Sequence, residues 1–399
     1  MMAGASTGRS LPQDLSAHNP SRPVEWLALL QCAAPRPNLD GFVRLVQDPF
    51  SWPVFLQHAE EHRVVPLVAA RVKDLDHALV PPEIRDKLLE LQRAQTFVAL
   101  QLTAELFRLH AHFANAGIQV LITKGASLAV RCYDEPGMRQ YGDLDVVIRE
   151  ADIRVATQAM LGLAYEPRVP LSAIDAQKTV GEYAFLKPGT DLLVEFHTER
   201  TFRYHPRRLQ IEKLFERSAY VVIDGRDVPV LSVEDELVLI CVHGAKHFWE
   251  RLMWIADVAA LISRQPLDWD SALAVANEVG AQRMLRLGLR LAADLLGAEL
   301  PAHVEATVQS DRAVAKLAAQ IESRLAHREL HEIEIFQRAA FRVRMRGGFL
   351  SGLAYLLRLS LTPTEEDWTS GKEGERRPFV DAIRRPLRLA RKHGRPSSK

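Results

Sequence analysis

The 399-residue sequence predicts an α+β fold, in which a small mixed sheet with helices lies in the middle of the chain and helical regions flank it on both sides. Short apolar runs bounded by turn residues lie at 118–123, 143–148 and 192–197, and such runs are typical of strands. Before and after this region, apolar residues recur three and four positions apart, which is typical of helices that bury one face. A chain of this length can bury a substantial core and suggests two or three domains.

The pattern along the chain divides it into five parts. The first part is rich in Ser, Gly and Pro and is expected to be disordered. A long helical segment opens at Pro81-Pro82, stops near Gly117 and leads directly into the first strand. A capping-box-like start at Ser232 opens the helices that follow the core. The expected parts are residues 1–23 (disordered N-terminus), 24–93 (N-terminal helical cap), 94–231 (core), 232–335 (C-terminal helical domain) and 336–399 (basic tail of helix and loop).

Local patterns predict how the strands of the core are connected. Residues 152–163 are amphipathic and should form a helix after the second strand. The turn Pro188-Gly189 is expected to join strands at 183–186 and 192–197 as a hairpin. Asp224-Gly225 is a strong hairpin signal and predicts a strand on each side of it.

Charge and cysteine content restrict the class of protein. The 51 Lys and Arg nearly cancel the 50 Asp and Glu, so there is no strong signal for nucleic acid as a partner, because nucleic-acid-binding domains are normally basic. Three scattered cysteines favour buried thiols in a reducing compartment over a disulfide framework. The sequence contains neither an apolar signal region at its start nor a run of about 18 apolar residues that would predict a transmembrane segment. We therefore expect a cytoplasmic protein.

Asp143 and Asp145 are the candidate metal ligands. They open an apolar strand in which alternate side chains share a face, so both carboxylates point the same way while Leu144 and Val146 point into the core. Two carboxylates on one face repel each other unless a cation lies between them, and hard oxygen ligands suit Mg²⁺. The alternative is a pair of solvated carboxylates at the end of a strand.

Glu195 is the candidate third carboxylate. It shares a strand face with His197 and lies between large apolar residues, where burial of its charge costs free energy unless a partner compensates it. A third carboxylate near Asp143 and Asp145 would complete a site for one or two Mg²⁺ ions that hold a nucleoside triphosphate. The alternative for Glu195 is a core residue in an ion pair.

Lys124-Gly125 lies between the first strand and an apolar helical run that includes Ser127. In a strand–glycine turn–helix pattern, the amides of the turn and of the helix N-terminus can meet an anion. Lys124 supplies a point charge, and Gly125 permits close approach of the backbone. We therefore expect Lys124, Gly125 and Ser127 to bind the phosphates of a nucleotide, with a turn glycine beside an exposed lysine as the alternative.

Arg139 is the second candidate cation, four residues before Asp143. A guanidinium can neutralise a triphosphate through bidentate hydrogen bonds. We expect Arg139 to bind the nucleotide, and pairing with Asp143 or Asp134 is the alternative.

His243 and His247 are four residues apart on a predicted helix and therefore on one face. Two such histidines can bind zinc, but zinc needs further ligands and none is offered locally. The favoured interpretation is that this face, with Lys246, contacts a phosphate or the acceptor, as His197 is also expected to do. Satisfied core histidines are the alternative, and Trp249 and Trp254 are expected to be core residues.

These segments together resemble the uncharacterised nucleotidyltransferase family of the DNA-polymerase-β-like superfamily. The resemblance runs from roughly Trp52 to beyond Leu300 and departs from the wider superfamily at the first helix, where Lys124-Gly125 stands in place of Gly-Ser. It implies a polymerase-β-like nucleotidyltransferase core, with Glu195 either deprotonating the acceptor or binding a second metal ion. The motifs that carry it are Lys124-Gly125-x-x-Leu128, residues 133–139 (YDEPGMR), Gly142-Asp143-Leu144-Asp145, Glu195-Phe196-His197, residues 242–247 (VHGAKH) and residues 254–257 (WIAD).

The resemblance implies an enzyme that uses Mg²⁺, with Mn²⁺ as a possible substitute, and a nucleoside triphosphate as co-substrate. The expected reaction transfers a nucleoside monophosphate to a hydroxyl or phosphate of an unidentified acceptor and releases pyrophosphate. Two alternatives stay open: a catalytically silent nucleotide-binding or interaction module, and a tailoring or toxin-type enzyme that modifies a peptide or protein side chain. Fold-level kinship is a poor guide to the substrate, so neither the acceptor nor the base is predicted.

Overall fold

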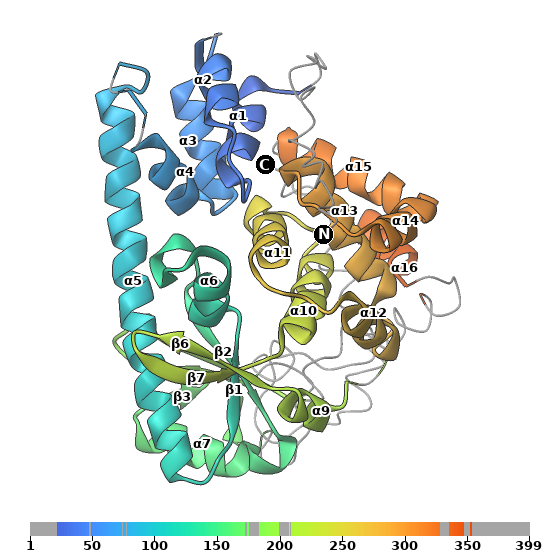
Figure 1. Ribbon diagram of the computed structural model, residues 1–399. Helices are drawn as coiled ribbons and strands as arrows, with labels where there is room; N and C mark the ends of the chain where they lie inside the picture. Colours follow the sequence, from blue (N-terminus) through green and yellow to red (C-terminus); the bar gives the residue numbers. More distant parts are fainter. Residues whose placement is uncertain are drawn as a thin grey trace, which may run out of the picture.

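A computed structural model describes residues 22–47, 49–73, 75–76, 78–171, 174, 183–198, 207, 209–327, 335–346 and 352. The expected disordered N-terminus lies outside the described residues except for its last two positions. Most of the expected basic tail also lies outside them. Within the described part, a mixed sheet lies at one end of the molecule and helices cover the rest (Figure 1).

Seven strands form one sheet in the order β3-β4-β5-β2-β1-β7-β6. The central strand β2 pairs antiparallel with β1 and parallel with β5, so the sheet is mixed as predicted. Both predicted hairpins are confirmed, because β4 pairs antiparallel with β5 and β6 with β7. The strands are β1 (Val120–Thr123), β2 (Asp143–Ile148), β3 (Glu166–Pro167), β4 (Tyr183–Leu186), β5 (Leu193–His197), β6 (Ala219–Ile223) and β7 (Arg226–Val230).

The two faces of the sheet belong to two hydrophobic clusters. Leu144 and Val146 lie in the cluster formed with helices α5 (Pro82–Asn115) and α7 (Ile153–Gly162), which confirms that they point into the core. Leu121 and Val147 point the other way, into the cluster formed with the remaining helices. The face with Asp143, Asp145 and Glu195 is therefore the one that the C-terminal helices and α6 cover, because strand side chains alternate.

The other helices form two groups around this face (Figure 1). One group precedes the sheet in sequence, and the larger group follows it. The first group is α1 (Val24–Ala33), α2 (Leu39–Gln47), α3 (Trp52–Glu61) and α4 (Val65–Val72). The second group is α10 (Val233–Lys246), α11 (Leu252–Arg264), α12 (Trp269–Glu278), α13 (Gln282–Leu296), α14 (Ala302–Ser310), α15 (Arg312–Ala326) and α16 (Ile335–Arg344). Short helices within the core region are α6 (Gly125–Tyr133), η1 (Pro136–Met138), η2 (Glu150–Asp152) and α9 (Ile211–Glu216).

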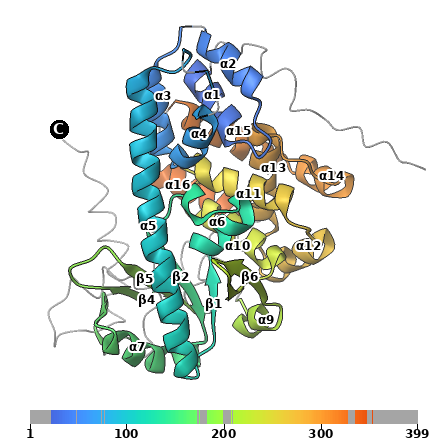
Figure 2. The same cartoon turned by 60° about the vertical axis from the view of Figure 1, so that its left-hand side comes forward.

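Helix α5 is 34 residues long and runs along the molecule from α4 to the far end of the sheet (Figure 2). Pro82 begins it, where a proline fits because the first amides of a helix have no intrahelical partner. Its N-terminal half packs on α4, and Leu102, Leu106 and Leu109 in its C-terminal half pack under the sheet. The expected boundary between cap and core at residues 93 and 94 falls inside this single helix, and the division into domains stays a prediction.

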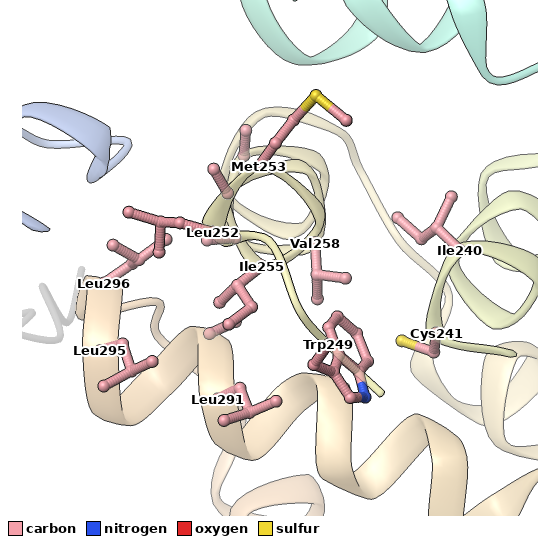
Figure 3. Close-up of a cluster of buried hydrophobic side chains, with 14 of the residues drawn as sticks. Ile240, Cys241, Trp249, Leu252, Met253, Ile255, Val258, Leu291, Leu295 and Leu296 are labelled. Carbon is pink, nitrogen blue, oxygen red and sulfur yellow. The ribbon is translucent and has the colours of Figure 1, made fainter. Parts of the chain in front are cut away.

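The C-terminal helices pack around Trp249, which is fully buried (Figure 3). A Cβ atom at Gly244 would lie 2.6 Å from the indole of Trp249, and one at Gly288 would lie 2.5 Å from Sγ of Cys241. Both distances are shorter than any real carbon contact, so only glycine allows α10 and α13 to approach the ring this closely. Trp249 is a core residue, as predicted.

A capping box consists of two reciprocal hydrogen bonds. The structure contains one of them at the predicted start of α10, where the Ser232 side chain accepts a hydrogen bond from the Asp235 amide. In the part of the chain that the structure describes, no helix combines the length and the apolar character needed to cross a bilayer.

Candidate nucleotidyl transfer site

The sheet register places three polar side chains in one row across neighbouring strands. Asp145 is opposite Thr123 of β1 on one side and opposite Glu195 of β5 on the other. Paired residues of neighbouring strands project from the same face, so the three side chains lie together. His197 is two residues beyond Glu195 and therefore also lies on this face.

Asp145 is buried and makes two short contacts through a single oxygen. Oδ1 of Asp145 is 2.6 Å from Nζ of Lys124 and 2.6 Å from Nε2 of His197. Burial opposes the negative charge, but Lys124 and His197 outweigh it and hold the pKa of Asp145 far below its ordinary value. Asp145 and its neighbours likewise raise the pKa of Lys124 against the opposing effect of burial, so both groups are charged at neutral pH.

Asp143 is two residues from Asp145 on the same strand and has the opposite pKa shift. Burial and the negative charge of Asp145 raise the pKa of Asp143, although Lys124 and Arg139 partly offset this. Its register partner on β5 is Leu193 and not Glu195, so Asp143 lies one step along the strand from the row described above. The opposed pKa shifts reflect repulsion between two carboxylates on one strand face, and a cation between them would relieve this repulsion.

The described residues contain one group of side chains whose geometry could hold a metal ion. Ligand atoms of Asp145, Glu195 and His197 all lie within 4.8 Å of one another. Two carboxylates and an imidazole form a donor set that suits a divalent cation, and Asp143 is available from the same strand. The ammonium group of Lys124 already compensates Asp145, which shows that this position favours positive charge.

The turn between β1 and α6 holds Lys124 in a rarely occupied backbone conformation. Its φ and ψ angles are 54° and −138°, a region that favours glycine. Glu236 of α10 stabilises the turn, because Oε1 accepts hydrogen bonds from the Lys124 amide at 3.0 Å and from Oγ1 of Thr123 at 3.1 Å. Ser127 donates a hydrogen bond to the Lys124 carbonyl at 2.8 Å, which occupies its hydroxyl proton within the turn.

Arg139 pairs with Asp257 of α11, which is neither of the two partners considered from the sequence. Nε of Arg139 donates to Oδ2 of Asp257 at 3.0 Å, and the hydroxyl of Tyr133 donates to Oδ1 at 3.1 Å. Both charged side chains are almost completely buried, and Asp257 opposes the effect of burial and keeps Arg139 charged, with a raised pKa. Asp134 instead pairs with Arg264.

His243 and His247 lie beside Trp254 in an aromatic cluster. The ring centroids of the two histidines are 4.6 Å apart, and each is between 5.3 and 5.4 Å from the indole of Trp254. Loss of hydration and the nearby charge of Lys124 hold the pKa of His243 well below its usual value, so this ring is neutral. Trp254 is only partly buried, whereas the sequence analysis expected a core residue. Lys246 lines a separate pocket with Met284 and Phe341.

Two residues of this region, Glu236 and Asp257, had no predicted role, and the sequence contains a signal for Asp257 alone. Asp257 is a single acid within the otherwise apolar α11, whereas Glu236 follows Glu234 and Asp235 in the acidic first turn of α10, and both Glu236 and Asp257 are at most 1% exposed. A buried acid needs partners, so each position marks a contact with another segment. The sequence does not say which segment that is.

Comparison with known proteins identifies the family of the chain. No curated protein matches the chain. Among solved structures, an antigenic nucleotidyltransferase-like protein from Paracoccidioides brasiliensis is similar over 51% of this chain and 94% of that chain, with 14% sequence identity and a TM-score of 0.31. A family model described as uncharacterised nucleotidyltransferase matches residues 48–297, which is more than half of the chain and includes the row of strands, the Lys124 turn and α10 to α13. The chain therefore belongs to the family of uncharacterised nucleotidyltransferases.

Proposed function

We propose that this protein is a Mg²⁺-dependent enzyme that transfers a nucleoside monophosphate from a nucleoside triphosphate to a hydroxyl or phosphate group of an acceptor and releases pyrophosphate. The observation that carries the proposal is the convergence of Asp145, Glu195 and His197 within 4.8 Å, directly beside the turn at Lys124. The carboxylate cluster would hold the metal ion, and the adjacent strand–turn–helix segment would bind the phosphates of the NTP.

Oxygens of Asp143, Asp145 and Glu195 would hold the metal ion. Bound there, Mg²⁺ neutralises charge on the attacked phosphate and orients the leaving group. Mn²⁺ also accepts carboxylate oxygens and fits the same set. His197 contacts Oδ1 of Asp145 and lies 4.0 Å from Oε2 of Glu195, so its role is to orient these two carboxylates.

Lys124 has a different role before and after a cation arrives. In this structure its ammonium group is bound to Oδ1 of Asp145, one of the residues that would hold the cation. Displacement from Asp145 leaves Nζ free to contact a phosphate oxygen as a point charge. The Gly125 amide and the start of α6 lie next to it and would bind the same phosphates.

Glu195 would act on the acceptor. An acceptor oxygen forms a bond to the α-phosphorus while the bond to pyrophosphate breaks, and the acceptor proton passes to the carboxylate of Glu195. No covalent intermediate with the protein is needed, so positioning and charge stabilisation supply most of the rate. Arg139 stays paired with Asp257 and would support the site from behind, through η1 and α11.

The test is isothermal titration of the protein with each NTP in the presence of Mg²⁺, using nonhydrolysable analogues, beside the variant Asp143→Ala/Asp145→Ala. We expect micromolar binding that requires Mg²⁺ and is lost in the variant. Asp134→Ala, an exposed acid on the neighbouring turn, is the matched control and should bind like the wild type. Equal binding by the wild type and the double variant would contradict the proposed metal site. Binding without pyrophosphate release for any acceptor would contradict the proposed transfer.

A further inference from the structure

The turn after α3 is fixed against the start of α11 by a buried histidine. His62 is fully buried, and its carbonyl accepts a hydrogen bond from the Met253 amide at 3.2 Å. Its Nδ1 accepts from the Leu252 amide at 3.4 Å, and its Nε2 is 3.3 Å from the Leu325 carbonyl. The neutral tautomer with the proton on Nε2 satisfies all of these contacts, so the turn is held in one place.

This arrangement places two arginines beside each other. Arg63 follows His62 with a φ angle of 56°, and Arg251 directly precedes Leu252. Loss of hydration lowers the pKa of both guanidinium groups, and the charge of Arg63 further lowers the pKa of Arg251. Within the described part of the chain, neither side chain forms an ion pair, whereas the side chains of Arg139 and Arg264 do. Asp143 acts on Arg63 and Glu250 acts on Arg251, but two adjacent like charges outside an ion pair repel each other, which costs free energy.

Arg251 is held in position by an aromatic ring. Its guanidinium lies 5.7 Å from the centroid of Trp254, the ring that also contacts His243 and His247. A guanidinium over an aromatic face keeps its hydrogen-bond donors directed outward. The half-buried position of Trp254, which the sequence analysis did not expect, is explained by this contact.

Arg63 lies near the proposed metal site. Asp143 raises the pKa of Arg63, and Arg139 lowers it, so Arg63 is within electrostatic reach of the first residue of β2. His243, which contacts Trp254, is in turn within reach of Lys124 and Asp145. Arg63 thus lies near the carboxylates beside the Lys124 turn, and the contacts of His62 with Leu252 and Met253 bring Arg251, from a segment distant in sequence, next to it.

We propose that Arg63 and Arg251 form a phosphate-binding pair at this site. Guanidinium forks match phosphate oxygens in a bidentate manner, and a phosphate between the two arginines would remove their mutual repulsion. The phosphate has two possible sources: the distal phosphates of the NTP, which rests on the proposed function, or a phosphate group of the acceptor. Both sources offer the same chemistry, and binding experiments separate them.

The experiment compares Arg63→Met and Arg251→Met with the wild type by isothermal titration, using ATP, AMP, inorganic tripolyphosphate and inorganic phosphate in Mg²⁺ buffer. Arg36→Met and Arg264→Met, exposed arginines in ion pairs elsewhere, are the matched controls. We expect each test variant to weaken binding of ATP and tripolyphosphate about tenfold or more, with AMP binding unchanged, because charge-assisted hydrogen bonds are lost. Thermal unfolding of all five proteins should coincide.

Two results would support the pair, and two would overturn it. Loss confined to ATP and tripolyphosphate assigns the pair to the nucleotide, whereas unchanged ATP binding with weakened binding of inorganic phosphate assigns it to the acceptor. Equal affinities of the wild type and both test variants for every probe would overturn the proposal, as would absence of any binding to the wild type. Because these measurements use affinity, a failure to detect nucleotidyl transfer would leave this comparison intact.

Discussion

Two buried carboxylates, Asp145 of β2 and Asp257 of α11, differ in how their charge is balanced. Asp257 uses both oxygens, one for Arg139 at 3.0 Å and one for Tyr133 at 3.1 Å. Asp145 places Lys124 and His197 on the same oxygen, each at 2.6 Å. Asp143 and Glu195 lie near Asp145 and also act on Lys124.

The difference separates a structural ion pair from the proposed metal site. The Asp257 pair joins η1 and α6 to α11, and its removal leaves Arg139 without its partner. Around Asp145, several carboxylates share one ammonium group, so an arriving divalent cation would balance charge that Lys124 alone does not. Burial and a charged partner are common to both sites, and the number of carboxylates per cation is one of the features that tells them apart.

The largest expected effect is on stability, from Asp257→Ala. Breaking a buried ion pair by removing one partner costs about 3–5 kcal/mol, because the other charge stays buried. The free energy of unfolding, measured with urea, should fall by this amount. Asp294→Ala, which removes an exposed ion pair on α13, is the control and should change stability by at most about 1 kcal/mol. A loss below 1 kcal/mol for Asp257→Ala would mean that Arg139 finds another partner.

A smaller effect, with a distinctive pH dependence, is expected for Asp145→Asn in buffer without divalent metal. Because Lys124 and His197 hold the pKa of Asp145 below its value in the unfolded chain, the charged carboxylate stabilises the folded state above that unfolded value, about 3.9. This stabilisation is lost as the pH falls below about 4. The wild type should therefore exceed Asp145→Asn in stability at pH 7, and the difference should shrink in acid. A difference that is constant with pH would contradict the ion pair.

The smallest effect is expected for Glu236→Gln, compared with Glu236→Leu. The amide of glutamine can still accept a hydrogen bond from the Lys124 amide and donate to Thr123, so NTP affinity should stay within about threefold of the wild type. Leucine leaves the Lys124 amide without an acceptor, which costs about 1–3 kcal/mol, and the strained turn should relax. Titration with an NTP analogue measures the affinity of both variants. Equal affinities of the two variants would show that the turn does not depend on Glu236.

The sequence was sufficient for six of the seven strands, the hairpins and the placement of Asp143, Asp145 and Glu195 on one face, because these features follow from patterns with a period of two residues and from turn residues, whereas the two-residue β3 was not predicted. It did not reveal partners that packing brings together from distant positions. Arg139 and Asp257 are 118 positions apart, and His62 and Leu252 are 190 apart. An isolated arginine or acid in the sequence shows that a partner is needed but carries no information on which segment provides it.

Helix α5 has a mechanical consequence for the site. It is a continuous rod about 50 Å long that attaches the helices bearing Arg63 to the sheet bearing Asp143. A continuous helix sets the relative rotation of the N-terminal helices and the sheet as well as their separation, because each residue turns the helix by about 100°. One residue inserted near Phe97, between the two packed halves, would rotate the first four helices around the helix axis and carry Arg63 away from the carboxylates without altering any residue of the site.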